Sequence, residues 1–183
     1  MIRVAADDAW IRAEMGGTTR ASVISKPEVV GALIKRAKRP LFILGHEIGG
    51  AGPESEALIE FIEGTTRICR IPVIGTSHSV KDLISKGIRI TKIMGGMETL
   101  DRLRDPEWKG LDGQGQYDLV LFAGLPYSLG WVLLSGLRHG APGLKSITLD
   151  RVYQPNASWS FGNMSVEPWR IQLQAISALL EKG

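Results

Sequence analysis

Two of the three histidines in this chain, together with a neighbouring acid, are of types that could carry out chemistry. His46 and His78 each follow a predicted strand, and Glu47 stands beside His46. If the two strands are neighbours in a sheet, both rings open into one crevice, where they could bind a metal or act as an acid–base pair. The alternative is a pair of exposed loop histidines that bond to backbone or ligand. The sequence favours this alternative, because no third metal ligand has a useful spacing.

A further group of side chains suits binding better than catalysis. Asp150 ends a predicted strand, where its carboxylate could accept hydrogen bonds from ribose or ribityl hydroxyls. Thr76 and Ser77 offer hydroxyls and a helix N-terminus from another loop. We predict a cofactor-binding edge formed by Gly45, His46, Thr76, Ser77, His78, Gly124 and Asp150.

The glycine-rich loop over residues 45–52 has two interpretations. Backbone amides at a helix start can hold a phosphate, and this loop follows the first long apolar strand. However, its glycines do not have the GxGxxG order, and the chain contains no GxxxxGK[ST] sequence. A plain flexible turn is therefore the favoured interpretation, with a phosphate-binding loop as the alternative.

An aromatic and amide-rich run, residues 156–163, follows the last predicted strand and contains no catalytic acid, base or nucleophile. Trp159 and Phe161 alternate with Ser158 and Ser160, so an extended backbone puts both rings on one side. Such a face suits a partner protein or a flat cofactor. We predict Trp108, Asn156, Trp159 and Phe161 as partner contacts, with burial of Trp159 and Phe161 in the chain's own core as the alternative.

Composition excludes several classes of function. The single cysteine, Cys69, rules out an internal disulfide and a self-contained four-thiolate cluster, so we expect no metal on this chain. The net charge is +3, but the dense basic residues within 35–39 close a predicted helix, which argues against nucleic-acid binding. No apolar run is long enough to cross a membrane and no signal sequence is evident, so we expect a cytoplasmic protein.

Apolar strands alternate with amphipathic helices along the 183 residues. This alternation predicts a three-layer α/β sandwich with a mainly parallel, Rossmann-like sheet and a ligand crevice at the carboxyl ends of the strands. Residues 1–20 show no periodicity and are expected to form an arm, while residues 21–183 form a single domain. A capping-box pattern at residues 25–28 predicts a helix ending near residue 38. The other predicted helices cover residues 54–63, 76–87, 97–104, 127–138 and 169–181, and the strands cover residues 40–45, 71–75, 88–94, 118–124 and 145–150.

Two long segments carry a family resemblance. Residues 105–118 with the strand that follows, and then residues 146–165, resemble the epsilon subunit of the archaeal acetyl-CoA decarbonylase/synthase complex. The resemblance extends in order and length from about residue 21 to the end. Residues 39–45 and 71–76 also look like the flavin- or nucleotide-binding middle domain of thiamine-diphosphate enzymes.

The resemblance implies an accessory chain in an α2ε2 component, a heterotetramer that serves one-carbon metabolism. Its alpha subunit carries nickel-iron and iron-sulfur clusters and interconverts carbon monoxide and carbon dioxide. The family's epsilon role implies stabilising alpha, with assistance in electron transfer to FAD. No catalytic residue transfers to this chain, because the family places catalysis on alpha.

Three hypotheses therefore stand. The first is a non-catalytic subunit that docks on a carbon monoxide dehydrogenase and has a flavin crevice. The second is a free-standing flavin- or nucleotide-dependent enzyme that uses His46 and His78. The third and weakest is a structural homodimer without a ligand.

Overall fold

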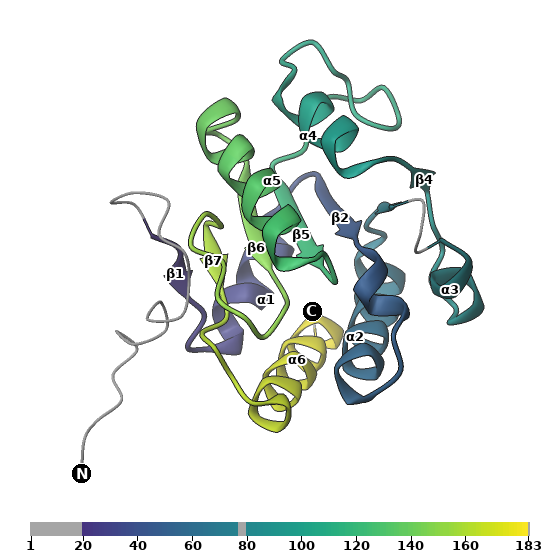
Figure 1. Cartoon of the computed structure of the whole chain (residues 1–183), viewed down its shortest axis with the longest axis vertical. Helices are drawn as coiled ribbons and strands as arrows, with labels where there is room; N and C mark the ends of the chain where they lie inside the picture. The colour runs from purple at the N-terminus through teal and green to yellow at the C-terminus, as the bar shows by residue number, and fades with distance from the viewer. Residues whose placement is uncertain (1–19, 77–79, 183) are drawn as a thin grey trace.

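The computed structural model describes residues 20–76 and 80–182, in which strands and helices alternate (Figure 1). The strands are β1 (Ser22–Val23), β2 (Pro40–Leu44), β3 (Val73–Gly75), β4 (Lys92–Ile93), β5 (Leu119–Ala123), β6 (Lys145–Thr148) and β7 (Trp159–Ser160). The helices are α1 (Pro27–Arg36), α2 (Pro53–Cys69), α3 (Val80–Ser85), α4 (Gly96–Arg104), α5 (Tyr127–Gly140) and α6 (Val166–Glu181), with a 3-10 turn, η2 (His46–Gly49).

The seven strands pair in parallel in the order β1-β7-β6-β5-β2-β3-β4. The prediction of an α/β sandwich with a mainly parallel sheet is thereby confirmed. Counted from β2, the order of the six strands β2 to β7 is that of dinucleotide-binding Rossmann sheets, and it reverses between β2 and β5. That reversal point is where such folds usually bind their ligands.

Helices cover both faces of the sheet and enclose two hydrophobic cores. One core receives Phe42 and Leu44 of β2 and is covered by α1, α2 and α6. The other receives Leu41 and Ile43 and is covered by α4 and α5. The alternation follows from the two-residue period of a strand. Both β2 and β5 are apolar because both of their faces are covered.

Two helices start or end differently from the sequence prediction. The N-cap of α1 is Lys26, with no side-chain cap bond, so the capping box predicted at residues 25–28 does not form. Pro27 occupies the first turn instead, where a missing N–H costs nothing. Helix α2 continues past the predicted end at residue 63 to Cys69, because Phe61, Ile62 and Thr65 bury its continuing apolar face.

The outer strands are short. The strand predicted over residues 88–94 is reduced to Lys92–Ile93, both exposed at the sheet edge. At the opposite edge β1, which the sequence did not predict, pairs with β7, placing Ser22 opposite Trp159. The Tyr153 hydroxyl donates to the Ala21 carbonyl at 2.8 Å and fastens this edge.

Within residues 20–76 and 80–182, none of the helices has the length and apolarity needed to cross a membrane.

Candidate functional site

The reversal point of the sheet is closed by the chain's own backbone. Gly45 and Gly124 directly follow β2 and β5, and the Glu47 amide donates to the Gly124 carbonyl at 2.9 Å. A Cβ atom on Gly45 would overlap the Gly124 carbonyl, and one on Gly124 would overlap the fully buried Ile48 side chain. Gly124 has φ +64°, which favours glycine. The position where Rossmann sheets receive a pyrophosphate is therefore filled.

The glycine-rich loop directs carbonyl groups, not amides, toward the ammonium group of Lys86. The Lys86 ammonium donates to the Ile48, Gly49 and Gly50 carbonyls at 3.4, 3.2 and 2.9 Å. The Ser55 hydroxyl also donates to the Ile48 carbonyl. A phosphate site requires converging N–H donors, and α2 begins with Pro53, which has none. The loop is thus braced by a cation, and its geometry does not suit a phosphate.

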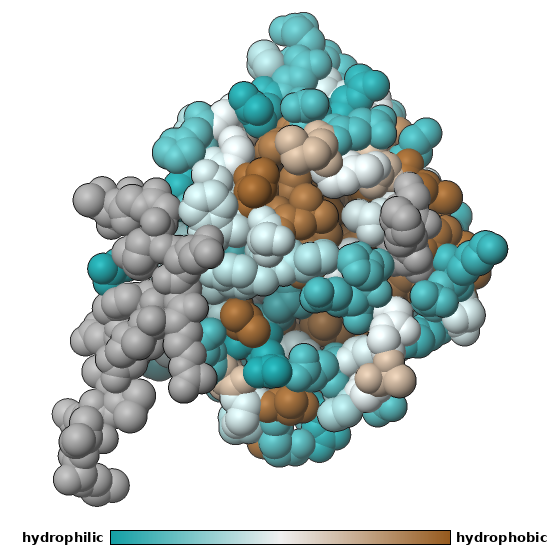
Figure 2. Space-filling model, viewed as in Figure 1, coloured by the Kyte–Doolittle hydropathy of each residue, from teal (hydrophilic) through white to brown (hydrophobic). Residues whose placement is uncertain are grey.

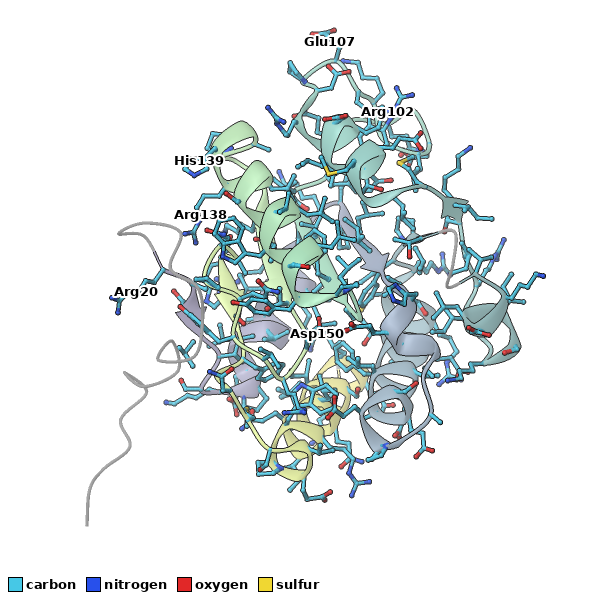
Figure 3. All side chains as sticks on the ribbon, viewed as in Figure 1. Arg20, Arg102, Glu107, Arg138, His139 and Asp150 are labelled. Atoms are coloured by element: carbon cyan, nitrogen blue, oxygen red, sulfur yellow. The ribbon has the colours of Figure 1, made fainter. Side chains whose placement is uncertain are left out.

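Asp150 braces the neighbouring strand end. The Gly124 amide donates to Asp150 Oδ1 at 2.8 Å, which joins the loop after β5 to the loop after β6. Asp150 lies between α2, α5 and α6 (Figure 3). Burial raises the pKa of its carboxyl to about 7, and Glu47 and Glu54 add to the rise, while the bond from Gly124 opposes it. The Asp150 carboxylate is therefore half neutralised near pH 7.

A small acidic cavity of about 110 Å³ lies beside Asp150. Glu47 and Glu54 line it too, and Arg151 pairs with Glu54 at 2.6 Å. Ligand pockets usually have volumes of about 300–1,000 Å³, so this cavity is too small for a flavin. Its three carboxyl groups would also repel a pyrophosphate. The cavity beside Asp150 therefore does not fit FAD.

The structure brings together only part of the predicted cofactor edge. Gly45, Gly124 and Asp150 meet, and Thr76 follows β3, with its amide bonded to the Leu44 carbonyl at 3.0 Å. His46 begins the 3-10 turn and is exposed. Ser77 and His78 lie outside the described residues, so the predicted pairing of His46 with His78 stays a prediction.

Other chemistry-bearing residues do not assemble either. In the part of the chain that the structure describes, no three His, Cys, Asp or Glu side chains are grouped to hold a metal ion. Burial raises the pKa of the Cys69 thiol, with Lys35 opposing, so the reactive thiolate is disfavoured. From the basic run, Arg39 pairs with Asp112 at 2.6 Å and lies over the Tyr117 ring.

The aromatic run requires a correction. Trp159 and Phe161 do face the same side, as the alternation predicts, but that side is the core between the sheet and α6. Phe161 is fully buried, and Asn156 is 2% exposed with its Nδ2 donating to the Trp131 carbonyl. Neither side chain is exposed at the surface of this chain, because the Phe161 ring packs in the core and the Asn156 amide is buried with a backbone hydrogen bond.

The two remaining predicted contacts, Trp159 and Trp108, are partly exposed but lie apart. Trp159 packs on the core under α1, α2 and α6, whereas Trp108 packs on the core under α4 and α5. Trp108 also tilts against Tyr117, with the ring centroids 5.8 Å apart. The four predicted contacts therefore do not form one surface.

Sequence reasoning missed three exposed apolar side chains, Met97 and Val132 on the contacting helices α4 and α5 and Ile93 in β4, which we group as one apolar patch. Their side chains are 52%, 52% and 46% exposed. Figure 2 shows apolar residues gathering over α5 and beside α4. The sequence signal was the pair Gly95–Gly96: a Cβ on Gly96 would lie 3.3 Å from the Leu133 side chain, so α4 can approach α5 closely at this point.

Comparison with known proteins identifies the family. Residues 8–177 match the family described as CO dehydrogenase beta subunit/acetyl-CoA synthase epsilon subunit. The acetyl-CoA decarbonylase/synthase complex subunit epsilon of Methanothrix soehngenii is 38% identical over 143 residues, 78% of this chain and 74% of the relative. That of Methanothermobacter thermautotrophicus is 33% identical over 172 residues, 92% and 94% of the two chains. The subunit epsilon 1 of Archaeoglobus fulgidus is 38% identical over 149 residues, 80% and 77%. This chain belongs to the CO dehydrogenase beta subunit/acetyl-CoA synthase epsilon subunit family.

Proposed function

We propose that this chain is the epsilon subunit of an acetyl-CoA decarbonylase/synthase complex and that it binds and stabilises a catalytic carbon monoxide dehydrogenase alpha subunit. The observation that carries the proposal is the extent of the match to the Methanothermobacter subunit, 92% of this chain and 94% of the relative. An alignment of that extent leaves no whole domain of either chain without a counterpart. This extent supports our proposal that the chain has an equivalent of the surface that joins the relative to its complex.

The patch of Ile93, Met97 and Val132 supplies a docking surface for alpha. All three side chains are about half exposed; Met97 and Val132 come from the contacting helices α4 and α5, and Ile93 comes from β4, which precedes α4 in the chain (Figure 1). Removing the exposed part of each from water contributes roughly 1 kcal/mol to binding. Patches of this kind, surrounded by polar residues, are typical of protein interaction sites.

Within this proposal the chain has a structural role, and the redox chemistry belongs to alpha. The carboxyl edge of the sheet is occupied by Lys86, Ile48 and Asp150, so we assign the chain no flavin-dependent step. We propose one chain per alpha subunit, an α2ε2 assembly, which the mass of the purified complex measures directly.

The proposal predicts that charges in the patch weaken binding to alpha. The double substitution Met97→Glu and Val132→Glu is expected to raise the dissociation constant at least tenfold, because two buried carboxylates would have no partner. Binding is measured by sedimentation or surface-immobilised titration with purified alpha subunit. Ile171→Glu on α6 is the matched control, since Ile171 is 56% exposed on the opposite face, and it is expected to bind as the wild type does.

The binding experiment distinguishes an error in the docking patch from an error in the subunit assignment. Wild-type affinity in a folded double variant would remove the patch from the interface while leaving the subunit assignment in place. Absence of binding by the wild-type chain would contradict the assignment itself. The stabilising role is tested by thermal unfolding of alpha, because a saturating ligand of the folded state raises the midpoint. An unchanged midpoint in a bound complex would contradict that role.

A further inference from the structure

Three arginines gather at the amino ends of β3 and β4, opposite the edge described above. Arg67 lies in the last turn of α2, Arg70 caps that helix, and Arg89 precedes β4. All three are exposed, and they line one open pocket of about 600 Å³. Ile71 and Pro72 form an apolar part of its wall. We call these three arginines with their pocket the basic pocket.

The positive charge of the basic pocket is not balanced from within. Within residues 20–76 and 80–182, none of the three guanidinium groups forms an ion pair, and Glu63 is the one acidic residue in the lining. By contrast, three other arginines each pair with a carboxylate at 2.6–2.7 Å: Arg39 with Asp112, Arg151 with Glu54 and Arg170 with Glu167. The pocket therefore carries a net charge of about +2 that an external anion could neutralise.

The backbone at Arg70 adds an independent observation. Its φ of 52° is left-handed, and Arg70 is the one non-glycine residue with positive φ in the described part of the chain. Helices commonly end with glycine in this conformation, because a Cβ is unfavourable there. The helix dipole favours cations at Arg67 and Arg70, but Arg89 comes from a different segment and no helix end accounts for it. A cationic side chain is thus held here against the local backbone preference.

We propose that the basic pocket binds an acidic segment of the subunit on which this chain docks, with carboxylate side chains seated against Arg67, Arg70 and Arg89. This inference rests on the proposed function. Guanidinium groups match carboxylates with paired hydrogen bonds, and arginine is enriched in protein interfaces. The apolar wall of Ile71 and Pro72 suits a peptide segment. A phosphate ligand is less suited, because the pocket borders the carbonyl end of α2 and no helix N-terminus.

The basic pocket is close to the proposed docking patch. Arg89 precedes Ile93 by four residues along the same edge, so the extended chain separates their Cα atoms by at most about 14 Å. One partner surface could therefore cover the apolar patch and reach around β4 into the basic pocket. Charge at the rim of an apolar contact sets orientation and association rate.

The test compares charge reversals in the full chain bound to purified alpha subunit. Arg67→Glu with Arg89→Glu reverses the basic pocket, while Lys26→Glu with Arg36→Glu reverses two exposed cations at the two ends of α1, away from the docking patch. The pocket variant is expected to bind at least tenfold more weakly at low salt and to lose most of the salt dependence of the dissociation constant. The control pair is expected to bind within about threefold of the wild type. Circular dichroism confirms that each variant is folded.

A second arm uses defined probes on the wild-type chain. A synthetic hexaglutamate peptide is expected to bind at low salt and to compete with alpha, and Arg70→Gly, which suits the backbone but removes the charge, is expected to weaken it. Equal binding of alpha by the pocket and control variants would overturn the inference and leave the subunit assignment intact. Saturable binding of inorganic phosphate with no binding of the peptide would also overturn it. Failure of the wild-type chain to bind alpha would contradict both this inference and the subunit assignment.

Discussion

The carboxyl and amino ends of the same parallel sheet are built in opposite ways. At the carboxyl end, Lys86 satisfies the loop carbonyls, Asp150 accepts from Gly124, and Ile48 fills the space between the loops. At the amino ends of β3 and β4, Arg67 and Arg89 line an open pocket and form no ion pair within residues 20–76 and 80–182. These two arginines are therefore at the end opposite the one where this fold usually holds its ligand.

This difference shows how a Rossmann-like sheet can keep its strand order while the loops at its reversal point pack against each other. Closing the reversal point requires a glycine at each of two strand ends and one buried aliphatic side chain. Each of these is a local change that leaves strand order untouched. Fold alone would have placed a cofactor here, whereas the side chains place their unbalanced charge elsewhere.

The strongest test of the closed end is Gly45→Ala. The added Cβ would overlap the backbone of Gly124, which cannot move without breaking the pairing of β2 with β5. We expect the free energy of unfolding to fall by about 3 kcal/mol, measured by urea denaturation. Gly95→Ala is the control, because nothing lies within 4 Å of its Cβ position and its φ is −64°. A similar small loss in both variants would mean that the reversal point is open.

Removal of the bracing cation is the next test. Lys86→Met removes the ammonium that donates to three loop carbonyls, of which the Ile48 carbonyl keeps its bond from the Ser55 hydroxyl, so the free energy of unfolding should fall by about 2 kcal/mol. Lys81→Met on the exposed side of α3 should change it by less than about 0.5 kcal/mol. If the two variants were equally stable, the loop would not depend on Lys86, and the contrast between the two ends would weaken.

The raised pKa of Asp150 predicts a pH dependence of the free energy of unfolding with a definite sign. Its pKa is about 7 in the folded chain, above the usual value near 4, so between these limits the folded chain holds a proton that the unfolded chain has lost. The free energy of unfolding therefore decreases as pH rises from about 4 to about 7, and this contribution is level above pH 7. Asp150→Asn should be similar in stability to the wild type at pH 4 and more stable by up to about 4 kcal/mol at pH 8, about 1.4 kcal/mol for each unit of the pKa difference.

Urea denaturation across this pH range measures the Asp150 effect, with Asp101→Asn on exposed α4 as a control that should show no such trend. A wild-type and Asp150→Asn difference that is constant with pH would mean that Asp150 is ionised like a surface carboxylate. The closed end would then be more open to water than its packing indicates.

The fold could be predicted well from the sequence because its signals were local. The apolar runs that became β2 and β5 have no polar alternation, which indicates strands covered on both sides, and glycine or proline marked their ends. β1 was missed because it is two residues long, and its partner, β7, lies 137 residues later. Its pairing depends on a distant segment, and no local pattern records that.

The candidate site was predicted less well. Asp150 and Gly124 were correctly placed at a common edge, since both follow strands. The hydrogen bond by which Asp150 and Gly124 stabilise each other's loops could not be predicted from the sequence, because it depends on how Ile48 and Lys86 pack from other segments. Phe161 was misassigned for a related reason: alternation shows which residues share a side, but not whether a helix such as α6 covers that side.

The pairing of Ser22 with Trp159 also has a consequence for synthesis of the protein. A chain emerging from the ribosome cannot form this sheet edge, or the bond from Tyr153 to Ala21, until nearly the whole polypeptide has been made. The earliest residues of the sheet are thus among the last to gain a partner, and until then they are exposed to proteases and chaperones. Completion of the edge at β1 therefore reports that the chain has been translated and folded at least as far as β7.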